Sequence, residues 1–286
     1  MGEEDCVSEM RAGNETPASG KWKEKFDDAG EFAMKLNVVL LAGGYATRLW
    51  PLTKNMPKAL LAVGEKTILG HVLHQLEKVP SVDTIYLTTN EKFARHFRLF
   101  LLLWRLEAKK RVELIVEAGT SEEMKKGAVG ALLHMHNKGL LNERTLIMAA
   151  DNLFGPDITN LLNEIAANEN ENAVVLVDVK RKATAKHYGI CAVDKGGTIV
   201  GFQEKPKMPK STLASTGCYV LSKELLDRLP EYAQGGGPMD RIGDFIGWLV
   251  PRAHLKGHTY TGKWFDIGTH EELERARKEH RKGLKA

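Results

Sequence analysis

Cysteine is scarce in this chain of 286 residues, which has only Cys6, Cys191 and Cys218. An odd number of cysteines without CxxC or other metal-ligand spacing argues against a disulfide framework and against a structural zinc site. Long apolar runs are also missing, because the most apolar stretch, residues 99–104, is far shorter than the ~20 residues of a membrane-spanning helix. The N-terminus has no apolar segment typical of a secretory signal. These absences predict a cytoplasmic protein without a membrane partner.

A marked excess of one charge is absent as well. The 41 Lys and Arg residues nearly balance the 37 Asp and Glu residues, which leaves a formal net charge of +4. This balance predicts no nucleic-acid partner, although local basic groups can still bind phosphates. A hydrophobic content of 43% is ordinary for a globular protein with a core, so the chain can enclose a pocket. Partners must therefore be sought in local sites, and the composition leaves a homo-oligomer open.

Composition divides the chain near residue 35. Residues 1–35 are rich in Glu, Asp, Lys, Gly and Ser and poor in aliphatic residues, which predicts a disordered or appended leader. From residue 36 onward, short aliphatic runs alternate with amphipathic helical patterns, as is typical of an α/β fold. We therefore predict one domain over residues 36–286. Its sheet should be Rossmann-like, mixed and mostly parallel, with helices on both faces.

Two styles of pattern follow one another along this domain. Strands are predicted at residues 37–41, 84–88, 112–116, 145–149 and 173–179, with helices near 68–78, 91–110, 121–138 and 158–168. Thr120, with Glu123 three residues later, resembles a capping box for the third helix. After residue 179 strands dominate, at 189–193, 199–204, 215–221 and 259–266, which predicts an added β-rich part. Thr269 and Glu272 form a second capping-box pattern that begins a C-terminal helix over residues 269–282.

The most informative segment is LAGGYATRLWPLTKNMPKAL, residues 41–60, which directly follows the first predicted strand. Gly43 and Gly44 let the backbone approach a ligand closely and direct N–H groups at phosphate oxygens. Thr47 and Arg48 add a hydroxyl group and a bidentate cation. The pattern is neither GxxxxGK(S/T) nor GxGxxG, which disfavours a P-loop or a dinucleotide-binding fold. A tight turn would also explain paired glycines, but together these residues predict a cradle for a triphosphate.

Two aspartates come at the ends of apolar strands. Asp151 ends the run LIMAAD, and Asp266 ends GKWFD before a glycine turn. Ligands of open α/β sheets bind outside the carboxyl ends of the strands. Two carboxylates can hold one Mg²⁺ against an α-phosphate while substrate oxygens and waters complete its octahedron. Either aspartate alone would more often cap a helix or stabilise a turn.

The whole string GGxATRLxPLTxxxPKALL resembles the signature of the sugar nucleotidyltransferases, also called NDP-sugar pyrophosphorylases, and the resemblance extends along nearly all of residues 36–273. The chain is similar in particular to glucose-1-phosphate thymidylyltransferases. This resemblance implies the nucleotide-diphospho-sugar transferase fold, with a nucleotide-binding part over about residues 36–178 and an acceptor-binding part over about 179–268. Ala46 departs from the signature, since many members have glycine at this position.

The resemblance assigns roles within the nucleotide-binding part. Arg48 and Lys58 correspond to the arginine and lysine that hold the phosphates of the triphosphate, while Glu117 and Gly127 correspond to positions that face the base. A carboxylate only accepts hydrogen bonds, so Glu117 would suit the N–H edge of thymine, uracil or guanine. A solvent-exposed strand end is the alternative interpretation of Glu117. The full set implied for nucleotide binding is Leu41, Ala42, Gly43, Gly44, Thr47, Arg48, Lys58, Glu117 and Gly127.

The segment FQEKP, residues 202–206, places a carboxylate beside a cation at the end of a predicted strand. Glu204 can accept hydrogen bonds from vicinal hydroxyl groups while Lys205 binds a phosphate, although a surface strand that turns at Pro206 would look the same. The EKP triplet resembles the family's sugar-phosphate motif, as do YG at 188–189 and STGCY at 215–219. The resemblance assigns Asp151 and Asp266 to Mg²⁺. It implies that the acceptor is bound by Asn152, Gly189, Glu204, Lys205, Thr216 and Gly217.

We therefore predict an enzyme that condenses a nucleoside triphosphate with a sugar 1-phosphate, giving an NDP-sugar and pyrophosphate. The triphosphate is dTTP or UTP by preference, the acceptor is glucose 1-phosphate by preference, and Mg²⁺ is the cofactor. Its catalytic residues are Arg48, Lys58, Asp151 and Asp266. A phosphate monoester with a second pKa near ~6 is its own nucleophile at neutral pH, so no general base is required.

Two other functions remain open from the sequence. One is a cytidylyltransferase for phosphocholine or another non-sugar phosphate, which an aromatic cage for a quaternary ammonium group would favour. The other is a regulatory subunit that binds a nucleotide-sugar without catalysis. Such a subunit could lose Lys58, Asp151 or Asp266 without penalty, and this chain has all three.

Overall fold

The computed structural model describes residues 35–106, 108–119 and 126–283, with side chains up to residue 281. The predictions for residues 1–34 and for the capping box of Thr120 and Glu123 therefore lie outside the described residues. Within the described part of the chain, no helix is both long and apolar enough to cross a membrane.

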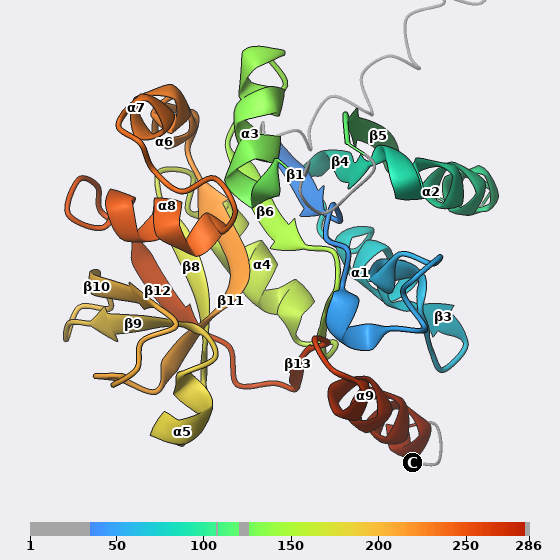
Figure 1. Cartoon of the computed structure of the whole chain (residues 1–286). Helices are drawn as coiled ribbons and strands as arrows, with labels where there is room; N and C mark the ends of the chain where they lie inside the picture. The colour runs from blue at the N-terminus through green and yellow to red at the C-terminus, as the bar shows by residue number, and fades with distance from the viewer. Residues whose placement is uncertain (1–34, 107, 120–125, 284–286) are drawn as a thin grey trace, which may run out of the picture. The chain divides into compact units, whose positions relative to one another are not determined.

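Parallel strands form the centre of the main sheet (Figure 1). Strand β1 (Leu36–Leu41) lies between β4 (Val82–Asn90) and β6 (Thr145–Ala149), and β5 (Arg111–Glu117) pairs with β4. Strand β1, with the sequence LNVVLL, is buried at every residue except the last, which is half-buried. Such burial is expected of a parallel strand that is covered on both faces. Because these strands run in the same direction, their carboxyl ends lie along one edge of the sheet.

Antiparallel pairing begins next to β6. Strand β11 (Leu213–Leu221) is antiparallel to β6, β8 (Ala173–Asp178) and β9 (Gly189–Val193). Strand β10 (Ile199–Glu204) pairs with β9, and β12 (Lys256–Thr259) runs parallel to β8. The β11 register breaks between Ser215 and Tyr219. The mixed sheet confirms the predicted α/β fold class with parallel strands at its centre.

Helices cover both faces of this sheet. On one face α1 (Ile68–Leu76), α2 (Glu91–Trp104) and α4 (Ile158–Ala167) contribute to one apolar core. On the other face α3 (Gly127–Asn137), α7 (Leu229–Gln234) and α8 (Ile242–Leu249) contribute to a second core. The carboxamide of Asn90 accepts a hydrogen bond from the Phe93 N–H at 3.1 Å, which caps α2 where β4 ends.

The C-terminal helix α9 (His270–Gly283) belongs to a smaller third core, where Leu273 and Ala276 pack with residues of the first loop region. As predicted, Thr269 and Glu272 form a reciprocal pair at its start, since the Glu272 N–H donates to the Thr269 hydroxyl and that hydroxyl donates to the Glu272 carboxylate. The remaining short elements are η1 (Thr47–Leu49), η2 (Lys58–Leu60), β2 (Ala62–Val63), β3 (Lys66–Thr67), β7 (Asn152–Phe154), α5 (Lys182–Ala185), α6 (Lys223–Leu226) and β13 (Trp264–Asp266).

Two sequence predictions were wrong beyond residue 220. A single strand over residues 259–266 is in fact two, because β12 ends at Thr259 beside β8 while β13 pairs with β7 in a separate two-stranded sheet. The segment between β11 and β12 was not predicted to be helical, yet it forms α6, α7 and α8. These helices are short and follow one another closely, so none presents the long periodic pattern on which a helix prediction depends.

Candidate active site

A cavity of about 1090 Å³ opens across the sheet. It is lined by the loop after β1, the ends of β5, β6 and β10, the start of β9, the irregular part of β11, and the segments before α8 and around the start of α9. This volume exceeds the roughly 300–1,000 Å³ that is usual for one small ligand. The cavity is therefore large enough for two substrates at once.

The glycine loop is attached to the neighbouring parallel strand through its backbone. The Ala42 N–H donates to the Thr88 carbonyl at 3.0 Å, and the Asn90 carboxamide donates to the Gly43 carbonyl at 2.9 Å. These two hydrogen bonds fix the loop against β4, and Gly43 and Gly44 lie on the cavity wall. A Cβ added at Gly44 would meet no atom within 4 Å, so this part of the loop is open to a ligand.

The backbone conformation of Ala46 explains why many members of the family have glycine at this position. Its backbone has φ 48° and ψ 45°, in the left-handed region that costs an L-residue roughly 1–2 kcal/mol. The buried Thr53 hydroxyl donates to the Ala46 carbonyl at 2.7 Å and stabilises this conformation. The next turn, η1, carries Arg48 on the cavity wall with its side chain exposed.

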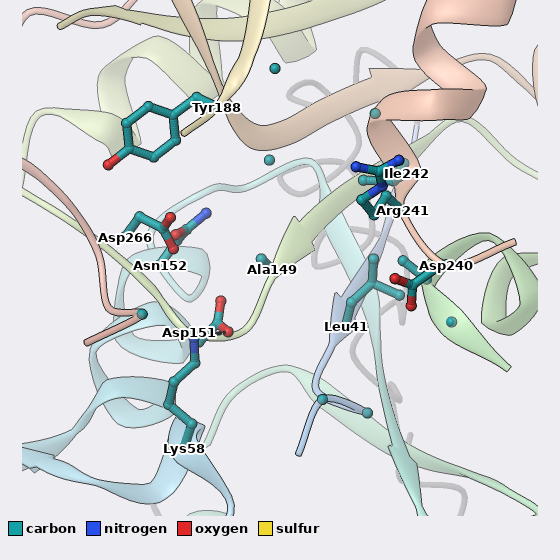
Figure 2. A pocket seen from close by; sticks show the side chains of 18 of the residues that line it. Leu41, Lys58, Ala149, Asp151, Asn152, Tyr188, Asp240, Arg241, Ile242 and Asp266 are labelled. Atoms are coloured by element: carbon teal, nitrogen blue, oxygen red, sulfur yellow. Dashed lines mark ion pairs between the residues drawn. The ribbon is translucent and has the colours of Figure 1, made fainter. Parts of the chain in front are cut away.

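Lys58 and the two strand-end aspartates come together in the cavity (Figure 2). The Lys58 ammonium lies 2.5 Å from the Asp151 carboxylate. Burial, and after it the charge of Asp151, raises the pKa of Asp266 to about 6. One lysine thus faces two carboxylates that repel each other.

Strand pairing brings these aspartates together. In the β7–β13 ladder, Asp266 lies opposite Asn152, the residue after Asp151. The Asn152 carboxamide also donates to the Thr216 carbonyl of β11, and its buried oxygen has no hydrogen-bond partner among the described residues. Asn152 therefore joins the aspartate pair to the irregular part of β11.

The donor set fits a hard divalent cation. The described residues contain no cluster of three or more His, Cys, Asp and Glu side chains that could hold a metal. Asp151 and Asp266 offer carboxylate oxygens alone, and burial together with the charge of Asp151 raises the pKa of Asp266. Two carboxylates with one lysine between them carry a net negative charge, and such a pair suits an ion that takes its remaining ligands from water and phosphate oxygens.

Glu204 and Lys205 lie at the end of the cavity that is lined by the antiparallel strands β9, β10 and β11, which we call the antiparallel end. The Glu204 carboxylate lies 4.0 Å from the Lys205 ammonium and 3.8 Å from the Arg241 guanidinium, and burial raises its pKa. Gly189 and Gly243 leave room for it, because a Cβ at these glycines would lie 3.0 Å and 2.2 Å from a Glu204 carboxylate oxygen. The carboxylate is thus held in place on two sides while it lines the cavity.

Glu117 lies at the other end of the cavity, which follows the parallel strands β1, β4, β5 and β6 and which we call the parallel end. The alternative interpretation of Glu117 as a solvent-exposed strand end was wrong. Glu117 is 6% exposed, and burial raises its pKa to about 7. Gly127, close by on the cavity wall, has φ +75°, and a Cβ there would lie 2.4 Å from the Asp240 Cα and the Met239 carbonyl oxygen. The Ala128 N–H donates to the Asp240 carbonyl oxygen at 2.9 Å, and the Val129 N–H donates to the Met239 carbonyl oxygen at 3.0 Å. The start of α3 is therefore occupied by the segment before α8.

The cavity brings together most of the predicted site residues. Ala42 and Thr47 do not line it, while the other predicted residues do, namely Leu41, Gly43, Gly44, Arg48, Lys58, Glu117, Gly127, Asp151, Asn152, Gly189, Glu204, Lys205, Thr216, Gly217 and Asp266. Their individual roles stay predictions. Sequence reasoning missed the segment from Asp240 to Gly243 on the cavity wall. The GGGP run just before this segment indicates a turn. Nothing in the local sequence indicates that the residues after the turn pack against the start of α3.

Comparison with known proteins gives the class of this chain. The family model described as nucleotidyl transferase matches residues 37–283. The chain belongs to this family.

Three curated relatives each share 28% identity with the chain over most of its length. The bifunctional protein GlmU of Methanococcus aeolicus is 28% identical over 82% of this chain and 51% of its own length. A putative mannose-1-phosphate guanyltransferase of Sulfolobus acidocaldarius is 28% identical, over 82% of this chain and 60% of its own. The UTP–glucose-1-phosphate uridylyltransferase AglF of Haloferax volcanii is 28% identical, over 84% of this chain and 95% of its own. The chain thus spans about half the length of GlmU but nearly all of AglF.

Solved structures agree with the fold. A putative glucose-1-phosphate thymidylyltransferase from Bacillus anthracis, in complex with a sucrose, superposes with a TM-score of 0.73 at 27% identity, covering 86% of this chain and 95% of that one. A UDP-glucose pyrophosphorylase complexed with UDP-glucose gives a TM-score of 0.71 at 20% identity, over 87% of this chain and all of the other. The second likeness concerns the fold alone.

Proposed function

We propose that this chain is a sugar-1-phosphate nucleotidyltransferase, which joins a nucleoside triphosphate to a sugar 1-phosphate and releases pyrophosphate. One observation supports this proposal above the others. A single cavity contains the glycine loop with Arg48 and Lys58, the carboxylate pair of Asp151 and Asp266, and the Glu204–Lys205 pair. These are the groups needed for a triphosphate, a divalent cation and a hydroxylated phosphate ester.

In the proposed reaction, an oxygen of the acceptor phosphate forms a bond to the α-phosphorus of the triphosphate. The bond from that phosphorus to the bridging oxygen of the β-phosphate breaks, and its electron pair leaves with pyrophosphate. Lys58 would reduce the charge repulsion between the two phosphates, and Arg48 would bind the departing pyrophosphate. Positioning and electrostatic stabilisation supply the rate, because the acceptor phosphate needs no base to become a nucleophile.

Asp151 and Asp266 would hold the divalent cation, which we propose is Mg²⁺. When bound, this ion supplies positive charge at the α-phosphate oxygens. The fit depends on two carboxylates that Lys58 alone cannot neutralise.

For the substrates we propose dTTP or UTP together with glucose 1-phosphate. The base preference is supported by buried Glu117, which as a carboxylate accepts a hydrogen bond from the N–H of thymine or uracil. The names of AglF and of the Bacillus anthracis protein agree with this pair. Other relatives are named for mannose 1-phosphate or for adenylyl transfer.

A substrate matrix tests the proposal. Each common nucleoside triphosphate is combined with glucose, mannose and N-acetylglucosamine 1-phosphates, with and without Mg²⁺, and pyrophosphate release is measured. We expect the fastest release with dTTP or UTP plus glucose 1-phosphate, and none without the metal. If no pair yields pyrophosphate, the proposed function fails.

The same assay separates the two alternatives. Phosphocholine with CTP is included for the cytidylyltransferase, and release confined to that pair would replace the sugar phosphate. A regulatory subunit would bind an NDP-sugar in calorimetry without any turnover. We favour catalysis because Lys58, Asp151 and Asp266 all line one cavity.

A further inference from the structure

Helix α2 carries a row of exposed leucines that the proposed reaction does not use. Leu99, Leu102 and Leu103 are 56%, 63% and 69% exposed, and Leu106, in the turn after the helix, is 82% exposed. Their spacing of three, four and seven positions places them on one side of a helix. None of them lines the active-site cavity. We call these four residues the leucine row.

The leucine row faces away from the sheet. Phe97 and Leu101 are buried against the first core, and each is two positions from Leu99, about 200° around a helix axis. Helix α2 thus has two opposite apolar sides, one packed on β4 and β5 and one exposed. In Figure 1 the helix lies at the right-hand edge of the molecule. Burial in the core explains only the inner side.

Basic side chains accompany the leucine row. Arg95, Arg98 and Arg105 are exposed, and within the described residues no ion pair joins any of them to an acidic side chain. Glu91, in the first turn of α2, is the one described acidic residue of the helix. The outer side of α2 is therefore apolar along its middle and positively charged beside it.

We propose that the outer side of α2 binds an anionic phospholipid surface. An exposed apolar side flanked by cations is the pattern of helices that lie in the membrane interface. The leucines would enter the boundary between headgroups and acyl chains, and Arg95, Arg98 and Arg105 would meet phosphate groups. The contact would be peripheral and reversible, since the helix keeps its inner side on the sheet. It does not depend on the enzymatic activity. It departs from the sequence prediction of no membrane partner, which considered only spanning helices and secretory signals.

Size and charge favour this occupant over a second copy of the chain. The row from Leu99 to Leu106 is only ~10 Å long and about one helix wide, whereas a stable protein interface buries about 800 Å² on each partner. Face-to-face pairing of two α2 helices would also bring their exposed arginines together. A lipid surface needs no matching partner side chains and supplies the opposite charge.

The first test is co-sedimentation of the full chain with vesicles of pure phosphatidylglycerol or pure phosphatidylcholine. We expect partitioning to phosphatidylglycerol only, and at least roughly tenfold weaker partitioning for the triple variant Leu102→Gln, Leu103→Gln and Leu106→Gln. The matched control is the double variant Val200→Gln and Met208→Gln, which removes side chains that are 60% and 85% exposed elsewhere. This control should sediment like the parent. Circular dichroism checks that each variant is folded.

The second test addresses the charges. Replacing Arg95, Arg98 or Arg105 singly with Gln should weaken partitioning about fivefold each, and raising the salt to ~0.5 M should weaken the parent in the same way.

Three results would overturn the proposal. The first is a parent chain that ignores phosphatidylglycerol vesicles, and the second is binding that survives loss of the leucines. The third is a vesicle-free dimer, measured by light scattering, that the triple leucine variant abolishes, because that result would assign the leucine row to a second copy of the chain.

Discussion

The two ends of the active-site cavity are built on different principles. At the parallel end, the cavity residues follow the strands directly, with Gly43 just after β1, Glu117 at the end of β5 and Asp151 shortly after β6. Parallel strands present all of their carboxyl ends at one edge, so residues at these positions meet without further information.

At the antiparallel end, position along a strand has no such meaning. Gly189 begins β9 and Glu204 ends β10, yet they lie directly opposite each other because the two strands run in opposite directions. Gly217 lies inside β11, where the register breaks. On the nucleotide side of such a site, residues can therefore be located from the sequence because they follow the carboxyl ends of parallel strands. On the acceptor side, residues can be located only when it is known which strands pair and in which register.

The largest expected effect comes from Asp266, which brings the two ends together through the β7–β13 ladder. Replacing Asp266 with Asn should lower kcat by roughly 10²–10³-fold in the pyrophosphate assay, since the divalent cation loses one of two carboxylates. The fold should survive, because burial already disfavours the charged carboxylate. The matched control is Asp157→Asn, an exposed aspartate outside the cavity lining. A near-normal rate for the Asp266 variant would remove the metal role from this residue.

The second effect concerns the contact between α3 and the segment before α8. Replacing Gly127 with Ala should lower the free energy of unfolding by roughly 3 kcal/mol or more, because the new Cβ meets backbone atoms at 2.4 Å. Gly139→Ala is the control, since its φ of +69° is similar but nothing lies within 4 Å. Its cost should be limited to the left-handed strain of about 1 kcal/mol. Urea denaturation measures both variants, and equal costs would contradict the packing described.

The third effect concerns Glu117 at the parallel end, which should make the free energy of unfolding depend on pH. The pKa of Glu117 is raised from 4.5 to about 7 in the folded protein, so the folded state favours the protonated form. The parent should therefore lose stability as the pH rises from 4.5 to about 7. Glu117→Gln has no such cost, and it should be more stable than the parent by ~1–3 kcal/mol above pH 7 and equal to it below pH 4.5. Urea denaturation across this pH range checks the prediction. A constant difference would show that Glu117 does not titrate in this range.

The smallest effect concerns the glycine loop. Replacing Ala46 with Gly relieves the left-handed strain at φ 48°, while the more flexible glycine favours the unfolded chain. The two terms leave an expected gain in the free energy of unfolding of up to ~1 kcal/mol, which thermal denaturation measures. A loss of stability would mean that contacts of the Ala46 methyl group outweigh the strain.

Local patterns were sufficient for much of the fold. The strands at 189–193 and 199–204 were predicted with the bounds that the structure has, because the turn residues DKGG at 194–197 separate the two short runs. The helix cap at Thr269 was likewise readable from two residues. The glycine loop and the aspartates could be proposed as a site because their residue types suit phosphate and metal wherever they meet.

Only the tertiary structure decided what depends on distant contacts. The break between β12 and β13, the return of Asp240 to Gly127, and the helices between β11 and β12 follow from partners far away in sequence. The sequence of α2 is apolar on two sides, and only the packed structure shows that Phe97 faces the core while Leu102 faces outward. By itself, the amino-acid sequence determined which chemical groups are present and how each short segment folds. The packing of segments against one another decided which of those groups meet, because burial and pairing are properties of the whole chain.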